Sequence, residues 1–338
     1  KGAAAMSRAR RDGDPRTGAA RRAFRCAAVC AAAALCVLSA LFGTFSPAGK
    51  AASAAGASSA IVVEVSTGRV LSESNADAKA YPASTTKILT ALVVLETLPL
   101  DLVVTVPREA AGVEGSSVYL RAGEKLTVEE LLYGLMLRSG NDAAVALALA
   151  AGGSVPRFAA MMNERAEKCG AKHSHFVNPH GLHDDEHYTT ARDLALITAE
   201  AYGNRDFCRI VSTRSVTVGE GESRRHFANK NKLLGTYGGA NGVKTGFTTK
   251  SGRCLVGGAY RDGMQLVSVV LNRYDMWEAT RAMLDKAFGE YEMRDVLSLP
   301  AAENGGRAVE VRFDESGAPV PAKYPVKRSG ESVGTVFV

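Results

Sequence analysis

Tyr81-Pro82-Ala83-Ser84-Thr85-Thr86-Lys87 is the stretch that decides the fold, because a helix has to begin inside it. Pro82 disfavours helical backbone at Tyr81. Beyond Ser84, apolar side chains recur at helical spacing, at Ile88, Leu89, Leu92, Val93 and Leu95. The sequence therefore predicts a helix that starts near Ser84 and turns an apolar face towards a core.

The predicted helix start places a hydroxyl group beside an amine. Ser84 and Lys87 are three positions apart, so their side chains share one face of the helix. Backbone N–H groups are unpaired at a helix N-terminus, where the helix dipole favours developing negative charge. A serine beside a base is an activated nucleophile. The same spacing also suits a capping serine and a solvated lysine, so other motifs have to decide between the two interpretations.

Composition allows a large buried core and does not indicate nucleic-acid binding. The chain has 338 residues, 46% of them hydrophobic, which suits one large domain or two smaller ones. The net charge of +6 owes much to the seven arginines that precede the first apolar run: Arg8, Arg10, Arg11, Arg16, Arg21, Arg22 and Arg25. Later basic residues alternate with acids, as on a solvated surface, so we expect no nucleic-acid partner.

Residues 1–57 have the pattern of an export signal. An almost uncharged apolar run from Cys26 to about Phe45 follows the basic leader, and Ala52-Ser53-Ala54 suits cleavage by a signal peptidase. An uncleaved membrane anchor is the alternative, because the run is long enough to span a bilayer. Both interpretations predict an exported protein that works outside the cytoplasm, in the cell envelope.

The cysteines indicate neither a metal site nor a disulfide framework. Cys26, Cys30 and Cys36 lie in the leader, and the remaining three are widely separated, at Cys169, Cys208 and Cys254. At most one bridge is expected, and buried free thiols are favoured.

The remaining patterns predict an α+β fold over residues 58–290. Residues 60–65 and 70–71 indicate a β-hairpin, and 243–247, 254–260 and 264–271 indicate strands, the last two joined by a tight turn. Thr127 and Glu130 form a capping-box pattern at one of the predicted helices, which cover 126–137, 143–151, 154–170, 190–203 and 276–288. A hairpin, a helical middle and a late meander predict one antiparallel sheet flanked by helices.

A small β-domain is predicted over residues 291–338. Val309 to Phe313 is strand-like and is followed by the turn residues Asp314-Glu315-Ser316-Gly317. Because the chain reaches Val338 within a strand-like run, we expect this domain to be incomplete.

Two further motifs follow the Ser84–Lys87 pair. Ser139-Gly140-Asn141 lies between two predicted helices, and Lys244-Thr245-Gly246 lies on a predicted strand. Each is ordinary alone, as a turn or as a strand end. The ordered combination of S-x-x-K, an S-x-N element and K-T-G is typical of penicillin-binding proteins and class A β-lactamases.

With these motifs the chain resembles the low-molecular-mass D-alanyl-D-alanine carboxypeptidases of the β-lactamase/transpeptidase superfamily. The similarity extends through residues 176–182 and 187–193, and it covers roughly 58–288 together with a following β-domain. It implies a β-lactamase/transpeptidase-like sheet flanked by helices, followed by a small all-β domain. It also implies removal of the terminal D-alanine from peptidoglycan stem peptides, with β-lactam antibiotics as acylating inhibitors.

The resemblance assigns roles to the motif residues. Ser84 is expected to attack the carbonyl of the penultimate D-alanine, and Lys87 has to be neutral to take its proton. Moving the pKa of a lysine from about 10.4 to about 7.5 corresponds to roughly 4 kcal/mol, which burial and the nearby cation Lys244 could supply.

The same resemblance assigns the substrate contacts. Ser139 is expected to carry a proton between Lys87 and the leaving amine, and Asn141 to bind the substrate backbone. Lys244 and Thr245 are expected to hold the terminal carboxylate, and the backbone N–H groups of Ser84 and Phe247 to form the oxyanion hole.

A histidine-rich stretch does not change this interpretation. His183 and His187 are four positions apart, but they flank Asp184-Asp185-Glu186 in a loop-like segment. We predict a surface loop near the active site, no metal and no cofactor.

Several alternatives stay open at this point. A β-lactamase is disfavoured, because no Glu-x-x-Leu-Asn element lies between Asn141 and Lys244. A DD-endopeptidase or transpeptidase differs only in groove shape. A catalytically silent wall-binding protein conflicts with the intact Ser84 and Lys87. Peripheral membrane association of the exported protein also remains open.

Overall fold

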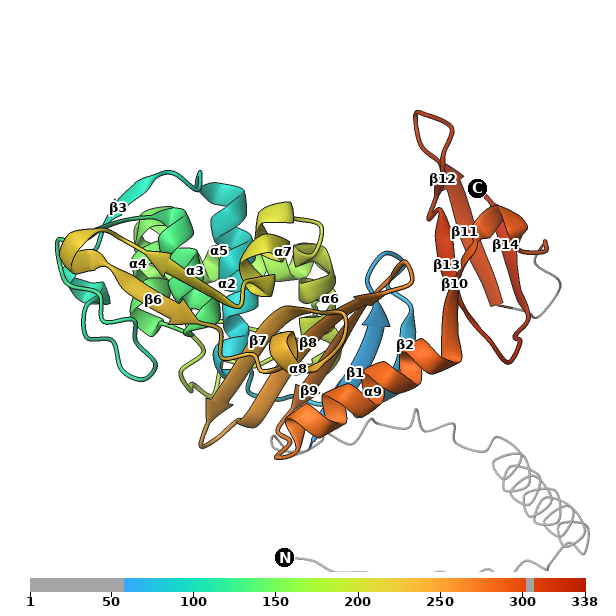
Figure 1. The fold of residues 1–338 in the computed structure, drawn as a ribbon, viewed down its shortest axis with the longest axis horizontal. Coiled ribbons are helices and arrows are strands. Elements are labelled where there is room, and N and C mark those ends of the chain that lie inside the picture. The colour runs from blue at the N-terminus through green and yellow to red at the C-terminus, as the bar shows by residue number, and fades with distance from the viewer. Residues whose placement is uncertain (1–57, 302–306) are drawn as a thin grey trace, which may run out of the picture. The chain divides into compact units, whose positions relative to one another are not determined.

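The computed structural model describes residues 58–301 and 307–338 (Figure 1). The proposed leader, residues 1–57, lies outside the described residues, so its interpretation as a cleaved signal or as an anchor stays a prediction.

A five-stranded antiparallel sheet organises the molecule, in the order β2-β1-β9-β8-β7. The predicted hairpin forms β1 (Ser59–Glu64) and β2 (Val70–Ser74). The predicted meander forms β7 (Ala240–Thr248), β8 (Gly252–Arg261) and β9 (Met264–Leu271). Pairing of β1 with β9 joins the hairpin and the meander into one sheet.

Both faces of the sheet are covered, which explains why every residue of β1 is buried. Val62 packs with Leu284 of α9 (Met276–Glu290), whereas Ile61 and Val63 belong to the large core shared with the helices. In Figure 1, α9 runs along one face of the sheet, and α2 to α7 gather on the opposite side.

The helix predicted after Ser84 lies at the centre of the helical layer. It begins with a 3₁₀ turn, Ala83–Thr86, and continues as α2 (Lys87–Thr97), which is buried from Lys87 to Val94. Around it pack α3 (Val128–Leu137), α4 (Asn141–Gly152), α5 (Val155–Lys168), α6 (Ala191–Ala201) and α7 (Arg205–Ser212).

Capping residues fix several helix starts. Thr127 and Glu130 form the predicted capping box of α3, and the side chains of Ser154 and Thr190 cap α5 and α6. One boundary was wrong: Leu126, predicted to be helical, belongs to the short strand β4 (Lys125–Thr127), which pairs with β3 (Val103–Thr105).

Three further short elements were not predicted. The strands β5 (Ser215–Val218) and β6 (Arg225–Ala228) pair with each other, and α8 (Leu233–Thr236) precedes β7. Each has only four residues, which is too short to show a clear periodicity in the sequence.

Strands also dominate the chain after Glu290. They are β10 (Tyr291–Asp295), β11 (Arg307–Phe313), β12 (Pro319–Val320), β13 (Lys323–Lys327) and β14 (Val333–Phe337). Five valines form a small core of their own: Val296, Val309, Val311, Val326 and Val333. The predicted β-rich character is confirmed, and the boundary at 290 stays a prediction.

Arg69 ties the first hairpin to this β-rich segment. Its guanidinium donates to both carboxylate oxygens of Glu331, at 2.7 and 2.8 Å, and to the carbonyl of Pro325. It also lies 5.0 Å from the ring centre of Tyr291 and 5.2 Å from that of Tyr324. Since Arg69 is only 6% exposed, this is a buried ion pair enclosed by aromatic rings.

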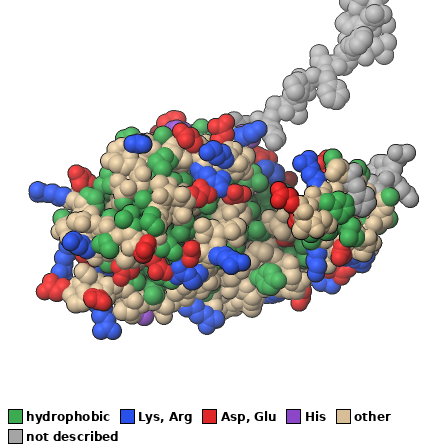
Figure 2. All heavy atoms as spheres, turned by 90° about the horizontal axis from the view of Figure 1, so that it is seen from above, with side chains coloured by type: hydrophobic (Ala, Val, Ile, Leu, Met, Phe, Trp, Pro, Cys, Tyr) green, Lys and Arg blue, Asp and Glu red, His purple; other side chains and the backbone are tan. Residues whose placement is uncertain are grey.

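Two surface properties bear on the sequence interpretation. On the face seen in Figure 2, Lys and Arg side chains are intermixed with Asp and Glu. Among the described residues, no single helix is long and apolar enough to cross a membrane; α4 and α5 would qualify only together, and they meet at 84°.

The three cysteines of the described residues are free thiols. Cys169 and Cys208 are half-buried, and Cys254 is buried.

Candidate active site

Ser84 lies in the 3₁₀ turn that opens α2, with its side chain half-buried. The turn is entered through Ala83, whose φ of 47° is unusual for a residue with a side chain. The Nζ atom of Lys87 lies 3.1 Å from the Ser84 Oγ atom. The predicted pairing of hydroxyl and amine is therefore present in the structure.

Two carbonyl oxygens orient the Lys87 amine. Its Nζ atom donates to Asn141 Oδ1 at 2.7 Å and to the backbone carbonyl of His180 at 2.6 Å. A neutral amine has two hydrogens and one lone pair. Since both carbonyl oxygens can only accept, the two hydrogens are occupied and the lone pair is left to face Ser84. This is the orientation that a base needs in order to take the hydroxyl proton.

Burial and neighbouring cations favour the neutral form of this amine. Lys87 is completely buried, and burial, followed by the charges of Lys244 and Lys230, holds its pKa well below the ordinary value. Asp142 acts in the opposite direction. Burial, assisted by Lys230, also lowers the pKa of Lys244 to about 7. Lys244 is thus the neighbouring charge with the largest effect on the pKa of Lys87, and its role in the reaction stays a prediction.

The turn between α3 and α4 brings Ser139 and Asn141 to the site. Ser139 adopts a φ of 66° and is 4% exposed, and its Oγ atom has no hydrogen-bond partner among the described residues. Asn141 uses both ends of its amide within the protein, because its Nδ2 donates to the Glu114 carbonyl at 2.6 Å. In this structure Asn141 therefore positions Lys87, and Ser139 is left with an unused hydroxyl.

Strand β7 closes the other side of the site. A Cβ atom added at Gly246 would lie 3.0 Å from the Pro82 carbonyl oxygen and 3.2 Å from the Ser84 nitrogen. The glycine therefore allows the strand to pack against the turn that carries Ser84. Lys244 Nζ donates to the Thr245 carbonyl at 3.0 Å, while the Thr245 side chain faces a groove and Phe247 is 63% exposed.

These elements enclose a groove of about 370 Å³. Its lining includes Ser84, Ser139, Thr245, Lys230, Lys232 and Arg253, and every charged side chain in that lining is basic. Lys230 is anchored by a contact of its Nζ atom with Ser116 Oγ at 3.2 Å. Such a groove suits a ligand that carries a carboxylate.

Asp142 is a structural residue that sequence reasoning missed. Its buried carboxylate accepts hydrogen bonds from the backbone of Val118, Leu120 and Ala143 and from the Ser117 hydroxyl, and so fixes the loop that flanks the groove. The only sequence signal for this role was the position of Asp142 directly after Asn141. A single acidic residue is too weak a pattern to predict a buried carboxylate.

The histidine-rich stretch is not simply a surface loop. Residues 183–186 are exposed as predicted, but His187 is buried, and burial lowers its pKa to about 3. Its Nδ1 accepts from the Val177 N–H at 3.1 Å, so its Nε2 carries the hydrogen that reaches Thr86 Oγ1 at 2.8 Å. His187 therefore supports the turn that holds Ser84. Within the described part of the chain, no cluster of His, Cys, Asp and Glu could hold a metal ion.

Gly181 is the second residue that sequence reasoning missed. Its φ is 85°, and an added Cβ atom would lie 1.8 Å from the Ala83 carbonyl oxygen. Only glycine fits at this position. Its missing side chain lets the segment around Gly181 approach the Ala83 turn closely enough for the His180 carbonyl to reach Lys87.

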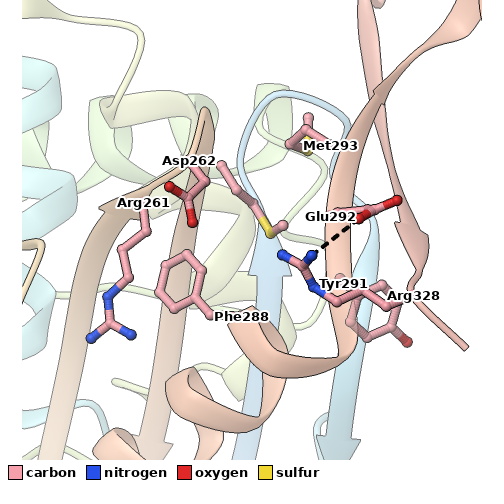
Figure 3. Close-up of a pocket in the computed structure, with 8 residues that line it drawn as sticks. Arg261, Asp262, Phe288, Tyr291, Glu292, Met293 and Arg328 are labelled. Carbon is pink, nitrogen blue, oxygen red and sulfur yellow. Dashed lines mark hydrogen bonds and ion pairs between the residues drawn. The ribbon is translucent and has the colours of Figure 1, made fainter.

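A separate cavity of about 310 Å³ lies between the β8–β9 turn, α9 and β10 (Figure 3). Arg328 in its wall pairs with Glu292 at 3.0 Å, as the dashed line in Figure 3 marks. None of the motif residues lines it, so we assign no chemistry to this cavity.

Comparison with known proteins shows which family the chain is similar to. A family model described as D-alanyl-D-alanine carboxypeptidase matches residues 46–275. The chain is 35% identical to the D-alanyl-D-alanine carboxypeptidase DacF of Bacillus subtilis over 245 residues, which are 70% of this chain and 63% of that protein. It is 36% identical to DacC of Escherichia coli, over 62% of this chain and 55% of that protein. The chain thus spans less than two thirds of the length of these two curated relatives.

Solved structures show the same fold. The D-alanyl-D-alanine carboxypeptidase DacD from Francisella tularensis superposes with a TM-score of 0.69 at 26% identity, covering 80% of this chain and 81% of that one. A variant of the Streptomyces K15 DD-transpeptidase gives a TM-score of 0.63 at 35% identity, covering 69% of this chain and 96% of that one.

Proposed function

The chain belongs to the D-alanyl-D-alanine carboxypeptidase family, and from this membership we propose that it hydrolyses the terminal D-alanine from peptidoglycan stem peptides. The observation that carries the proposal is the pair of hydrogen bonds that turns the lone pair of Lys87 towards Ser84. An inactive relative that only bound cell wall would not need this arrangement.

Acylation begins with a proton transfer. Lys87 takes the proton of the Ser84 hydroxyl while Oγ attacks the carbonyl of the penultimate D-alanine. We assign the stabilisation of the resulting oxyanion to the backbone N–H groups of Ser84 and Phe247, and the close packing of β7 against the Ser84 turn supports this assignment. Losing one such donor typically costs about 3 to 4 kcal/mol.

The leaving residue is held and protonated on the other side of the scissile bond. Thr245 and the basic groove lining bind its carboxylate. We assign the same task to Lys244, although it is buried and does not itself line the groove. Ser139 relays a proton from Lys87 to the departing amine, a role that fits its buried and otherwise unused hydroxyl. Water then hydrolyses the ester with Lys87 as the base. When a substrate enters, Asn141 has to exchange its contact with Glu114 for one with the substrate backbone.

We place this reaction outside the cytoplasm, in the cell envelope. The basic leader and apolar run within residues 1–57 support export, and the substrate class is a cell-wall peptide. N-terminal sequencing of the protein from its native envelope distinguishes cleavage near Ala54 or Ala57 from retention as an anchor. A mature chain that begins before Cys26 would mean retention.

Two assays test the proposal. A defined pentapeptide should release D-alanine with multiple turnovers, measured by mass spectrometry. Penicillin should instead acylate Ser84 nearly stoichiometrically, because its opened ring stays tethered and obstructs water; each tenfold slowing requires only about 1.4 kcal/mol. Ser84→Ala should fold and form no adduct. Rapid penicillin hydrolysis without D-alanine release would favour the β-lactamase alternative instead.

A further inference from the structure

Residues 176–182, between α5 and α6, supply the His180 carbonyl that accepts a hydrogen bond from Lys87. A backbone carbonyl can orient an amine only if the peptide group that carries it is itself held in place. The group that holds it belongs to the same segment and is the side chain of Asn178.

Asn178 uses both ends of its amide within this segment. Its Oδ1 atom accepts from the N–H groups of His180 and Gly181, at 3.2 and 2.7 Å. Its Nδ2 atom donates to the Leu182 carbonyl at 3.0 Å. The side chain therefore binds backbone groups on both sides of the carbonyl that Lys87 uses.

The peptide group between His180 and Gly181 is held from two directions. Its C=O accepts from Lys87, and its N–H donates to Asn178. The two groups point in opposite directions across a planar trans peptide, so a rotation of this peptide would break both bonds together. A hydrogen bond to the N–H also polarises the C=O and strengthens it as an acceptor.

Helix α2 holds the preceding residue of the segment. Thr90, three positions after Lys87, donates from its Oγ1 atom to the Pro179 carbonyl at 2.7 Å. Two successive carbonyls thus accept from one face of α2. Thr90 fixes where the segment lies, and the orientation of the next peptide group is left to Asn178.

We propose that Asn178 is a positioning residue for the proposed reaction, because it orients the peptide group whose carbonyl occupies a hydrogen of the Lys87 amine. The lone pair of that amine is then left to face Ser84. This inference rests on the proposed function. Since Asn178 does not line the groove, its effect should appear in the acylation step and not in the binding that precedes it.

A charge at position 178 gives this role a readout in the pH profile. The titratable groups that act on Lys87 or are acted on by it are Lys244, Lys230, Asp142, His180 and His187. Burial lowers the pKa of both histidines to about 3, so they stay uncharged throughout the assay. A carboxylate in place of the Asn178 amide would add a negative charge near the His180 carbonyl and raise the pKa of Lys87.

Stopped-flow acylation by penicillin separates the dissociation constant of the first complex from the acylation rate constant. Asn178→Ala should lower the rate constant by at least about 30-fold and leave the dissociation constant unchanged. In Asn178→Ser the hydroxyl can still accept a nearby N–H, so the loss should stay within about fivefold. Asn178→Asp should shift the acid limb of the profile upwards by at least about half a pH unit.

Asn204, at the start of α7, is the matched control. Its Oδ1 atom also accepts from the N–H groups two and three residues on, those of Asp206 and Phe207, at 2.9 and 3.0 Å. Both asparagines are half-buried, and Asn204 likewise lies outside the groove lining. Asn204→Ala should lower the melting temperature about as much as Asn178→Ala, with no change in the acylation rate constant.

The failures of the two proposals are distinguishable. A wild-type acylation rate in Asn178→Ala, an equal slowing in Asn204→Ala, or an acid limb that Asn178→Asp leaves in place would overturn this inference and leave the carboxypeptidase proposal intact. If Asn178→Ala does not fold, the shift in Asn178→Asp decides. A wild-type protein that neither releases D-alanine nor acquires a penicillin adduct would overturn both.

Discussion

At the scale of single residues, the proposed mechanism makes the rate of acylation depend on the protonation states of Lys87 and Lys244. Lys87 must be neutral, so the rate should fall on the acid side as it takes up a proton. In the proposed mechanism Lys244, whose pKa burial lowers to about 7, binds a carboxylate as a cation, so kcat/KM should also fall as the pH rises above about 7. Stopped-flow acylation by penicillin tests this bell shape. A rate that still increases at pH 9 would contradict it.

A substitution at Lys230 should shift both the acid and the alkaline limb of the pH–rate profile of acylation. Its charge lowers the pKa of both Lys87 and Lys244, so Lys230→Gln removes a repulsion and should raise both pKa values. The acid and alkaline limbs should therefore shift together to higher pH. Lys250→Gln, which removes an exposed charge outside the groove lining, is the matched control and should leave both limbs in place.

Gly181 tests how tightly the nucleophile turn is held. Gly181→Ala introduces a left-handed alanine, which costs about 1–2 kcal/mol, and also a Cβ clash with the Ala83 carbonyl. The displaced turn should slow acylation by about 100-fold. Gly263→Ala has a similar φ of 79° but open space around its Cβ, so it should cost stability alone. Equal acylation rates in the two variants would show that the clash is relieved elsewhere.

At the scale of elements, the start of α3 depends on its capping box. Thr127→Ala removes the acceptor of the Glu130 N–H and should lower the free energy of unfolding by about 1 kcal/mol. Glu130→Ala should cost more, because Glu130 also accepts from the Gly219 N–H at 2.8 Å and thereby anchors β5. Urea unfolding measures both changes. Thr127→Ser keeps the cap and should retain nearly the full stability.

The sequence could predict the helices that begin at a capping residue and the strands that form a long apolar run. Thr127, Ser154 and Thr190 mark helix starts, and the buried strands β8 and β9 are long apolar runs. The strands β3 to β6 have three or four residues and depend on tertiary contacts. In the site, the motifs located Ser84, Lys87 and Lys244. The contact from the carbonyl of His180 could not be predicted, because every residue has a backbone carbonyl and only the fold brings this one to Lys87.

At the scale of the whole molecule, Arg69 should determine how firmly the β-rich segment is held. Arg69→Ala leaves Glu331 without its partner, and breaking a buried ion pair typically costs about 3–5 kcal/mol. We expect faster proteolysis within residues 291–338, with acylation of Ser84 changed by less than about twofold, since Arg69 does not line the groove. Arg312→Ala removes an exposed arginine of the same segment and is the control. Unchanged proteolysis in Arg69→Ala would show that the other contacts suffice.

The position of β1 in the sheet has a consequence for folding during synthesis or export of the chain. This strand is made early, yet it lies between β2 and β9 in the sheet, and its Ser59 pairs with Leu271. A ribosome or a transport channel delivers the chain from its N-terminus, so β1 can pair with its second neighbour only after β9 has emerged. The site around Ser84 and Lys87 is also incomplete until then, because Gly246 of β7 packs against the Ser84 turn. The proposed nucleophile should therefore become competent only after β9 has emerged, and a nascent chain that stops short of Leu271 should remain inert.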